Sequence, residues 1–459
     1  VDEDKLVEEA IIKMLAQLDP HSTYSDAEEV KKMNEPLQGN FEGIGVQFQM
    51  IEDTLLVVQP VSKGPSEKIG ILAGDRIIAV NDSAIAGVKM STEEIMKRLR
   101  GPKGSKVNLK IVRRGVQDPL VFTVKRDKIP ILSLDASYMI QPKTGYIRIN
   151  RFGATTAEEF KKAMKELQKQ GMKDMILDLQ GNGGGYLNAA IDLANEFLGQ
   201  KELIVYTEGR TAKRSDFYAK GNGEFRNGRL IVLVDEYTAS ASEIVSGAVQ
   251  DWDRGIIVGR RSFGKGLVQR PIDLPDGSMI RLTIARYYTP AGRCIQKPYD
   301  SSTDYNKDLI ERFNHGELMN ADSIHFPDSL KVQTKKLGRT VYGGGGIMPD
   351  YFVPIDTTLY TDYHRNLVAK GAVIKFTMKF IEGHRKELAN KYKKFGSFNE
   401  KFIIDDDMLA TLREMGEKEG VKFNEEQYQK SLPLIKTQLK ALIARDLWDM
   451  NEYFRVMNT

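Results

Sequence analysis

The first residues of the chain follow a helical pattern of apolar positions. Residues 3–17 (EDKLVEEAIIKMLAQ) form one amphipathic stretch, which ends at the proline-containing segment LDPHS at 18–22. A second short helix is expected at 26–35. The apolar positions that recur near the helical period are Leu6, Ile11, Ile12, Met14 and Leu15. We therefore predict a helical N-terminal region at residues 1–38.

After residue 38, apolar and polar residues begin to alternate along the chain. Val46, Phe48 and Met50 alternate with two glutamines, as residues of a half-buried strand do. Further strands are expected at 55–58, 76–80, 107–112 and 120–124, and helix starts at 64–66 and 91–94. This set predicts a β-rich unit of five or six strands and two helices at residues 39–128.

Residues 145–295 alternate strand and helix patterns, which predicts an α/β core. The expected strands are 145–149, 175–179, 230–234, 256–258 and 278–288, and the expected helices are 156–170, 187–198 and 241–252. Residues 297–342 lose this periodicity and are expected to form an insertion or extended loop. We place the core at 129–355 and a mostly helical C-terminal region at 356–459.

Composition limits the possible functions. The 459 residues are 41% hydrophobic and 28% charged, with a net charge of +4, as in ordinary globular domains. No dense Lys/Arg block with interleaved aromatic residues occurs, so no nucleic-acid partner is expected. The single cysteine, Cys294, excludes an internal disulfide. No apolar run approaches the roughly 18 residues of a membrane span. Because the chain starts at Val1, we expect a mature or trimmed form, with any signal peptide or lipid anchor upstream.

A candidate nucleophile lies where a strand pattern gives way to a helix pattern. Ser240 follows the apolar segment 230–234 and directly precedes the helix expected at 241–252. The first amides of a helix are unpaired and favour an anion, so the N–H of Ala241 is a candidate oxyanion donor. The alternative is that Ser240 only caps the helix. The rival serine, Ser242, is expected inside the helix start, where its hydroxyl bonds to the backbone.

A lysine is the candidate base for this serine. A serine hydroxyl needs a base to remove its proton, and none of the five histidines lies in a Gly/Ser-rich motif. Lys265 lies in GRRSFGKG (259–266), which fails the phosphate-loop pattern at Gly266 and leads into a strand-like stretch, so nucleotide binding is not favoured. Burial would give the neutral amine that a base requires, whereas the alternative is a surface lysine. On a strand, positions i and i+4 share a face, so we expect Gln269 beside Lys265.

A third segment offers backbone amides. The stretch LDLQGNGGG at 177–185 leaves a strand and enters a glycine-rich turn, whose bare amides suit an oxyanion hole. Gly184 and Gly185 are the candidate donors. Taken alone, this segment is equally compatible with an ordinary strand–helix loop.

Three segments in this order resemble the motifs of the carboxyl-terminal processing peptidases, also called tail-specific proteases. The segments are DLQGNGGG (178–185), SASE (240–243) and FGKGLVQ (263–269). The roles implied by the resemblance are nucleophile for Ser240, general base for Lys265, positioning of the lysine for Gln269, and support for Glu243 and Asp251. LDPHS (18–22), FEGIGV (41–46), RYYTPAGR (286–293) and GIMPD (346–350) also look like family signatures. Gln180 and Cys294 stand where the family often has Arg and Ser, but neither belongs to the dyad.

The resemblance also implies an architecture. It is a mixed α/β fold with a core akin to the crotonase and Clp protease folds, an inserted PDZ domain at 39–128 and helical terminal regions. In a PDZ domain, a glycine-rich turn holds the C-terminal carboxylate of a peptide that adds as a strand to a sheet edge. The residues that match this turn are Gly43, Ile44, Gly45 and Val46. The helix near 91–99 would form the other wall of the groove.

We therefore expect a serine endopeptidase that recognises protein C-termini and cleaves by a Ser–Lys acyl-enzyme mechanism. No metal or organic cofactor is expected, because the acidic residues are scattered and the histidines lack ligand spacing. The resemblance implies an extracytoplasmic place in the bacterial envelope (periplasm), in protein processing or turnover. It also implies a homodimer, with any membrane association made through a segment outside this chain. The alternative is a non-catalytic or latent PDZ scaffold that binds peptides.

Overall fold

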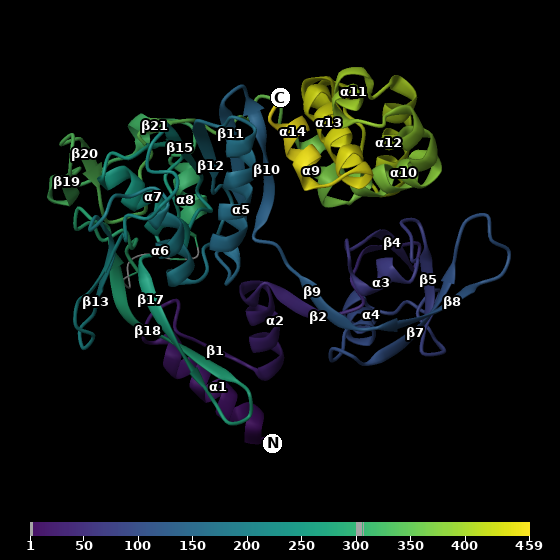
Figure 1. Ribbon diagram of the computed structural model, residues 1–459, viewed down its shortest axis with the longest axis horizontal. Helices are drawn as coiled ribbons and strands as arrows, with labels where there is room; N and C mark the ends of the chain where they lie inside the picture. The colour runs from purple at the N-terminus through teal and green to yellow at the C-terminus, as the bar shows by residue number, and fades with distance from the viewer. Residues whose placement is uncertain (1–2, 300–304, 306) are drawn as a thin grey trace. The chain divides into compact units, whose positions relative to one another are not determined.

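A computed structural model describes residues 3–299, 305 and 307–459 of the chain. Contacts between residues divide the chain into two units. The first unit combines residues 1–39 with 132–355, and the second combines 40–131 with 356–459. Figure 1 labels most of the helices and strands of both units. Each unit is therefore assembled from segments that are far apart in the sequence.

The first unit is built on a six-stranded sheet in the order β10-β11-β12-β15-β16-β21. Its strands are β10 (Leu134–Gln141), β11 (Thr144–Ile149), β12 (Asp174–Asp178), β15 (Leu230–Val234), β16 (Ile256–Gly259) and β21 (Tyr351–Phe352). The pairs from β11 to β21 are parallel, and β10 adds antiparallel to β11. Parallel strands joined by helices are what the alternating pattern predicts, so the expected α/β core is confirmed.

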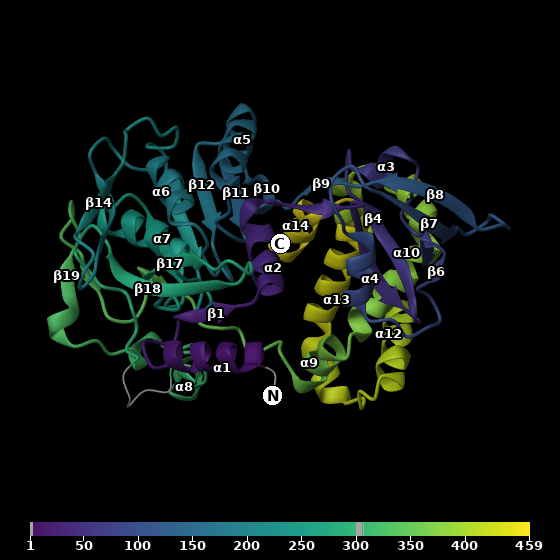
Figure 2. The ribbon, with the colours of Figure 1, turned by 90° about the horizontal axis from the view of Figure 1, so that it is seen from below.

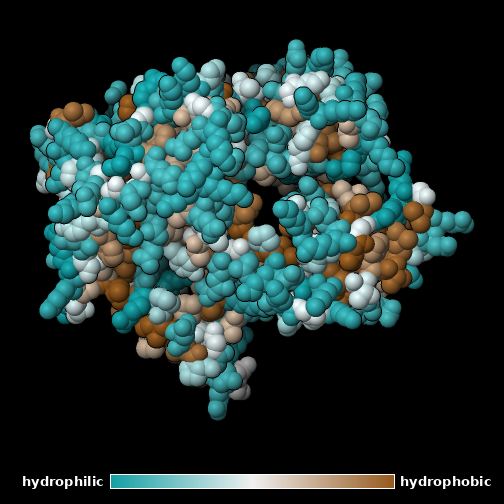
Figure 3. All heavy atoms as spheres, viewed as in Figure 1, coloured by the Kyte–Doolittle hydropathy of each residue, from teal (hydrophilic) through white to brown (hydrophobic). Residues whose placement is uncertain are grey.

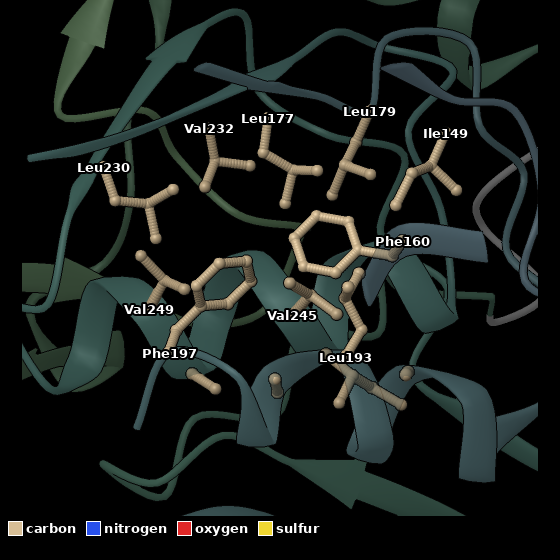
Figure 4. Packing of buried hydrophobic residues seen from close by; sticks show 14 of the residues in the cluster. Ile149, Phe160, Leu177, Leu179, Leu193, Phe197, Leu230, Val232, Val245 and Val249 are labelled. Atoms are coloured by element: carbon tan, nitrogen blue, oxygen red, sulfur yellow. The ribbon is translucent and has the colours of Figure 1, made fainter. Parts of the chain in front are cut away.

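Three helices supply the core beneath this sheet. They are α5 (Thr156–Lys169), α6 (Leu187–Asn195) and α7 (Ala241–Asp251). Figure 4 shows Leu177 and Val232 of the sheet facing Phe160, Phe197 and Val245 from the helical layer. These side chains are fully buried, and burial of each stabilises the fold by roughly 1.5–3 kcal/mol. The turns at the carboxyl ends of β12 and β15 follow directly from strands that are anchored in this core.

A second sheet flanks the first within the same unit. Its order is β1-β18-β13-β14, with β17 also paired to β18. The strands are β1 (Thr23–Ser25), β13 (Leu203–Glu208), β14 (Ser215–Tyr218), β17 (Leu267–Asp273) and β18 (Met279–Tyr288). The N-terminal helices α1 (Glu3–Ala16) and α2 (Ala27–Gln38) precede and follow β1. Figure 2 shows α1 next to β1 on the β18 side of this unit. The two predicted N-terminal helices are confirmed.

The segment at 297–342 is more regular than the expected insertion or loop. It contains α8 (Asp308–Asn314), two 3-10 turns (Ala321–Ser323 and Asp328–Leu330) and a hairpin of β19 (Lys331–Gln333) and β20 (Thr340–Tyr342). Arg261 and Arg312 both pair with Glu317 at 2.6 and 2.7 Å. Ion pairs of this kind hold the segment in place, although its sequence has no periodic pattern of apolar residues. Residues 300–304 and 306 of the segment lie outside the described part.

The second unit contains the β-rich unit predicted at 39–128. Its six-stranded sheet consists of β3 (Val46–Ile51), β4 (Thr54–Pro60), β5 (Arg76–Val80), β6 (Ser83–Ala84), β7 (Lys106–Val112) and β8 (Leu120–Lys125). Two helices, α3 (Pro65–Lys68) and α4 (Thr92–Leu99), complete it. The strands β2 (Asn40–Gly43) and β9 (Asp127–Pro130) pair where the chain enters and leaves. The predicted number of strands and helices is confirmed.

The remainder of the second unit is a helical array with its own core. Its helices are α9 (Asp362–Ala369), α10 (Ala372–Lys391), α11 (Phe395–Lys401), α12 (Asp406–Lys418), α13 (Glu425–Leu447) and α14 (Met450–Met457). Phe376, Phe398 and Leu439 are buried at its centre. The face of the molecule in Figure 3 is mostly hydrophilic. Within the described residues, every helix is too short or too polar to cross a membrane.

Candidate active site

Ser240 lies in a strained turn between β15 and α7. Its φ of +57° and ψ of −116° are unusual for a residue with a side chain, and such a conformation costs about 1–3 kcal/mol. A serine that only caps a helix takes an extended backbone instead. The turn before it is fixed by Asp235, whose carboxylate accepts from the amides of Gly181 at 2.9 Å and Thr238 at 3.0 Å. The strain favours a functional role for Ser240 over simple capping.

Glu243, in the first turn of α7, is fully buried behind Ser240. Its carboxylate accepts four hydrogen bonds. The donors are the Ser240 amide at 2.8 Å, the Ser262 hydroxyl at 2.5 Å, the Gly264 amide at 2.7 Å and the Lys265 amide at 2.9 Å. Burial raises the pKa of Glu243, and these hydrogen bonds oppose that rise. Glu243 therefore ties the serine turn to the loop that carries the lysine.

The glycine-rich turn after β12 packs directly against Ser240. A Cβ on Gly184, whose φ is +100°, would lie 2.7 Å from the Ser240 Cβ, so only glycine fits there. The Gly184 amide donates to Asn182 Oδ1 at 2.8 Å. The expectation that Gly184 is an oxyanion donor is therefore wrong for this conformation, because its N–H is already used. Among the described residues, the amides of Gly185 and Ala241 have no acceptor, and both residues line the cavity beside Ser240.

Lys265 lies between two glycines just before β17. A Cβ on Gly264 would lie 3.0 Å from the Gly346 amide nitrogen, so the loop packs closely. Burial lowers the pKa of Lys265, and the nearby charge of Arg281 lowers it further. Asp19 and Glu243 oppose this shift but do not reverse it. The neutral amine is therefore easier to reach than in an exposed lysine.

Gln269 reaches the same cavity as Lys265, although not for the reason that the sequence suggested. Lys265 precedes the strand, and a register shift between Val268 and Gln269 breaks the alternation of β17. The i, i+4 argument is thus wrong, although Gln269 does line the cavity together with Lys265. The Gln269 side-chain amide donates to the backbone carbonyl of His21. Sequence patterns did not predict this partner, which lies 248 residues away.

The cavity that holds these groups has a volume of about 620 Å³. Ser240, Ala241, Lys265, Gln269 and the 183–185 turn all line it. Within the described part of the chain, no hydrogen bond joins Lys265 Nζ to Ser240 Oγ. Tyr287 also lines the cavity, and its hydroxyl donates to the Lys265 carbonyl. Burial raises the pKa of Tyr287 well above its usual value, and an interaction with Ser240 only partly opposes this.

Two other predicted residues lie away from the cavity wall. Asp251, at the far end of α7, is fully buried and pairs with Arg293 at 2.5 Å. It also accepts from the Ala291 amide at 2.8 Å, so it supports the α7 packing rather than the reacting groups. Ser242 is buried and donates to the Asn182 carbonyl at 3.0 Å. Its hydroxyl bonds to the backbone as predicted.

The proposed peptide-binding turn in the second unit has the expected local geometry. Gly43 ends β2, Ile44 is buried, Gly45 has a φ of +73°, and Val46 begins β3. The Ile44 carbonyl accepts from the Ser66 hydroxyl at 2.6 Å, which fixes the turn. Strand β3 is the edge of its sheet and so leaves a row of backbone groups for another strand.

Comparison with known proteins identifies the family. Residues 143–303 match peptidase family S41, residues 43–128 match a PDZ domain, and residues 363–449 match a family of unknown function. A carboxy-terminal-processing protease of Bartonella bacilliformis is 40% identical over 302 residues, which are 64% of this chain and 68% of that protein. The chain belongs to the carboxy-terminal processing proteases of peptidase family S41. It is accordingly a serine peptidase with a PDZ domain, and the fold class and family predicted from the motifs are confirmed.

Other relatives cover different shares of the chain. The carboxy-terminal processing protease CtpA of Bacillus subtilis is 38% identical over 64% of this chain and 63% of its own length, less than two thirds. A probable CtpA-like serine protease of Staphylococcus aureus is 36% identical over 90% of this chain and 80% of its own length. The solved photosystem II D1 C-terminal processing protease is 28% identical, with a TM-score of 0.42, over 79% of this chain and 85% of that one.

Proposed function

We propose that this chain cleaves protein substrates through a Ser240–Lys265 dyad after its PDZ domain has bound their C-termini. The observation that carries the proposal is one cavity shared by a serine in a strained turn and a lysine whose pKa is lowered by burial. Glu243 supports it, because this one carboxylate holds both loops. Gln269, fixed by the His21 carbonyl, is the group that orients the amine.

The proposed reaction is an acyl transfer to Ser240 and then to water. Neutral Lys265 takes the Ser240 proton, and Oγ attacks the peptide carbonyl. The oxyanion is held by the amides of Ala241 and Gly185, which have no acceptor among the described residues. The ammonium of Lys265 then protonates the leaving amine. Lys265 next activates the water that releases the acyl group. Hydrogen bonds to catalytic groups often tighten only when substrate binds, so the open dyad is compatible with this course.

The PDZ domain supplies recognition of the substrate tail. A free carboxylate would bind at the turn of Gly43, Ile44, Gly45 and Val46, and the tail would extend β3. The named relatives are bacterial proteases, so we place this chain in envelope protein processing, in the extracytoplasmic space. We also propose a homodimer, which the exposed apolar residues Leu6, Val7 and Met14 of α1 support.

One observation favours a second candidate, a latent enzyme that acts as a peptide-binding scaffold until it is switched. In the part of the chain that the structure describes, Lys265 Nζ and Ser240 Oγ are not hydrogen-bonded. In a latent enzyme this separation would persist when substrate binds. The two candidates differ in turnover, not in affinity for a peptide tail.

The decisive experiment measures cleavage of an unfolded protein with an apolar C-terminus. We expect Ser240→Ala and Lys265→Ala each to lower kcat by at least about 10³-fold, because the nucleophile and its base act as one unit. Lys213→Ala, which removes an exposed lysine of the same unit, should cut like the parent. If both dyad variants cut at the parent rate, the proposal is wrong. Tail binding without cleavage by the parent supports the latent scaffold.

A further inference from the structure

The described residues that line the cavity around Ser240 include basic side chains but no acidic one. Its charged lining residues, among those described, are Arg151, Lys265 and Arg281. Much of the remaining wall is apolar, with Met33, Leu37, Ile244 and Met279 among its residues. The proton transfers of the dyad use only the lysine, so neither guanidinium group reacts in them.

Arg281 is the more informative of the two. It shares the cavity-facing side of β18 with Met279 and Tyr287, because alternate residues of a strand lie on one face. Its side chain is partly buried, and among the described residues its guanidinium donates a hydrogen bond only to the Met33 sulfur, which is a weak acceptor. In the described part of the chain, no carboxylate pairs with Arg281. A partly buried charge without an anion is costly, so a ligand that supplies one gains free energy there.

Arg151 could bind the same anionic ligand as Arg281. Its Nε donates to Asn150 Oδ1 at 2.7 Å, which fixes the side chain. None of the described residues accepts from its two terminal nitrogens, so they are available to a ligand. A guanidinium of this kind binds a carboxylate through two parallel hydrogen bonds.

The acidic residues near the cavity do not neutralise these charges. Asp19 and Glu243 both act on Lys265. Asp19 already accepts from the His21 amide, from the Ser22 amide and hydroxyl, and from the Thr283 hydroxyl. Glu243 accepts the four hydrogen bonds described above. Both carboxylates are therefore committed to the protein itself.

We propose that Arg281, together with Arg151, forms a carboxylate-binding subsite next to the nucleophile. The subsite selects substrates that place an acidic group in the cleft. That group is an Asp or Glu side chain near the cleaved bond or the C-terminal carboxylate of a substrate with a short tail. The inference rests on the proposed peptidase function and adds a substrate class to it.

The test uses internally quenched peptides of one parent sequence with an apolar C-terminus. A single Glu is placed at successive positions, and each Glu peptide is paired with its Gln counterpart. A second pair compares the free C-terminal acid with its amide. Parent, Arg281→Ala and Arg270→Ala proteins are compared by the ratio of kcat/KM within each pair. Arg270 is exposed and does not line the cavity, so its variant controls for the loss of one positive charge on the same hairpin.

We expect the parent to favour Glu over Gln by about tenfold at one or two positions, and Arg281→Ala to abolish that preference. A preference for the free acid that depends on Arg281 assigns the C-terminal carboxylate instead. Arg270→Ala should keep the parent ratios, and higher salt should reduce them, because screening weakens a partly exposed pair. The subsite is overturned if neither preference depends on Arg281.

A binding measurement separates this outcome from failure of the proposed function. Calorimetric titration of the same peptide pairs into Ser240→Ala and into the Ser240→Ala, Arg281→Ala double variant needs no turnover. A Glu preference in Kd that is lost with Arg281 supports the subsite even if the parent cuts nothing. The PDZ domain also prefers a free acid, so only the part of a preference that is lost with Arg281 counts. Equal Kd values for Glu and Gln peptides, together with an acid-over-amide preference that is the same in both variants, reject the subsite, even if cleavage by the parent confirms the peptidase.

Discussion

Glu243 is the residue through which the serine turn and the lysine loop depend on each other. Its carboxylate accepts from the amides of Ser240, Gly264 and Lys265 and from the Ser262 hydroxyl. A carboxylate has four lone-pair positions and no donor, and it matches these four donors. Burial alone would raise the pKa of Glu243 and favour its neutral acid form. The four hydrogen bonds act in the opposite direction, because they stabilise the charged carboxylate. The SASE motif indicated a supporting role but not this connection.

Replacing Glu243 with glutamine should therefore damage catalysis more than folding. The NH2 group of the glutamine would face N–H or O–H groups that now donate to the carboxylate. At least one of these donors would lose its acceptor, which should lower the free energy of unfolding by about 1–3 kcal/mol. The resulting shift of either loop should lower kcat by roughly 10²-fold, with KM nearly unchanged. Urea unfolding and peptide kinetics measure both effects.

The matched control is Glu236→Gln. Glu236 is also buried, but it pairs with Arg260 at 2.6 Å and does not line the cavity. This variant should lose stability while kcat falls by less than threefold. Equal losses of kcat in the two variants would contradict the connecting role of Glu243.

The pH dependence of the reaction depends on the charge around Lys265. Burial, then Arg281, lowers the pKa of this lysine below its ordinary value of 10.5. The rate should therefore rise as Lys265 loses its proton, with a midpoint of kcat/KM below that value. Arg281→Ala removes a positive charge near Lys265, which raises the pKa of the lysine. The midpoint of kcat/KM should therefore move to higher pH. A profile of kcat/KM between pH 5 and pH 10 measures this. An unchanged or lower midpoint in Arg281→Ala would refute the electrostatic argument.

At the scale of elements, the turn before β1 brings an N-terminal segment into the site. Asp19 accepts from the amides of His21 and Ser22, and Thr283 of β18 donates to it at 3.0 Å. Burial would raise the pKa of Asp19, but these hydrogen bonds outweigh it, and its pKa lies below the ordinary value. The turn so fixed presents the His21 carbonyl to Gln269. The LDPHS signature thus has a physical role in holding a cavity residue.

Asp19→Ala should loosen this turn and, with it, Gln269. We expect kcat to fall by roughly tenfold, while binding of a peptide tail to the PDZ domain is unchanged, because the two lie in different units. Asp276→Ala is the control, since Asp276 holds a similar serine-containing turn at the end of the β17–β18 hairpin. Kinetics with one quenched peptide and titration with its C-terminal fragment distinguish the effects. If kcat falls equally in the Asp276 variant, the role assigned to the Asp19 turn is wrong.

The elements differ in how far the sequence predicts them. The strand at 230–234 is continuously apolar, the strand at 76–80 is apolar after Arg76, and both match the prediction residue for residue. The bulge at Val268 and Gln269 has no local signal, because its cause is the pairing with β18. The two-residue strand β21 joins the central sheet beside β16, about 90 positions earlier in the chain, and a strand so short has no period to detect. Pairings of this kind depend on tertiary context rather than on propensity.

At the scale of the whole chain, two units have separate tasks in the proposed reaction. The motifs predicted the nucleophile and base segments because close packing restricts the residues that fit, as at Gly184 and Gly264. They did not predict Arg281, since a single arginine in a strand has no surrounding pattern. In the proposed reaction, binding of the tail by the PDZ domain would raise the local concentration of the rest of the substrate for cleavage. Tail recognition should therefore be separable from catalysis by substitution.

Val46→Asp tests this separation. Val46 begins the edge strand β3 and is partly buried against the PDZ core, so a carboxylate there should repel a peptide carboxylate and disfavour an apolar last residue. We expect kcat/KM for a substrate with a free apolar tail to fall by about tenfold, to the value for the same substrate with an amidated tail. Gln47→Asp puts the same charge on the exposed neighbour and should leave both values unchanged. Equal losses on the free and the amidated substrate would mean that the PDZ domain does not select tails. In that case the cavity and its arginines alone would determine which chains are cut.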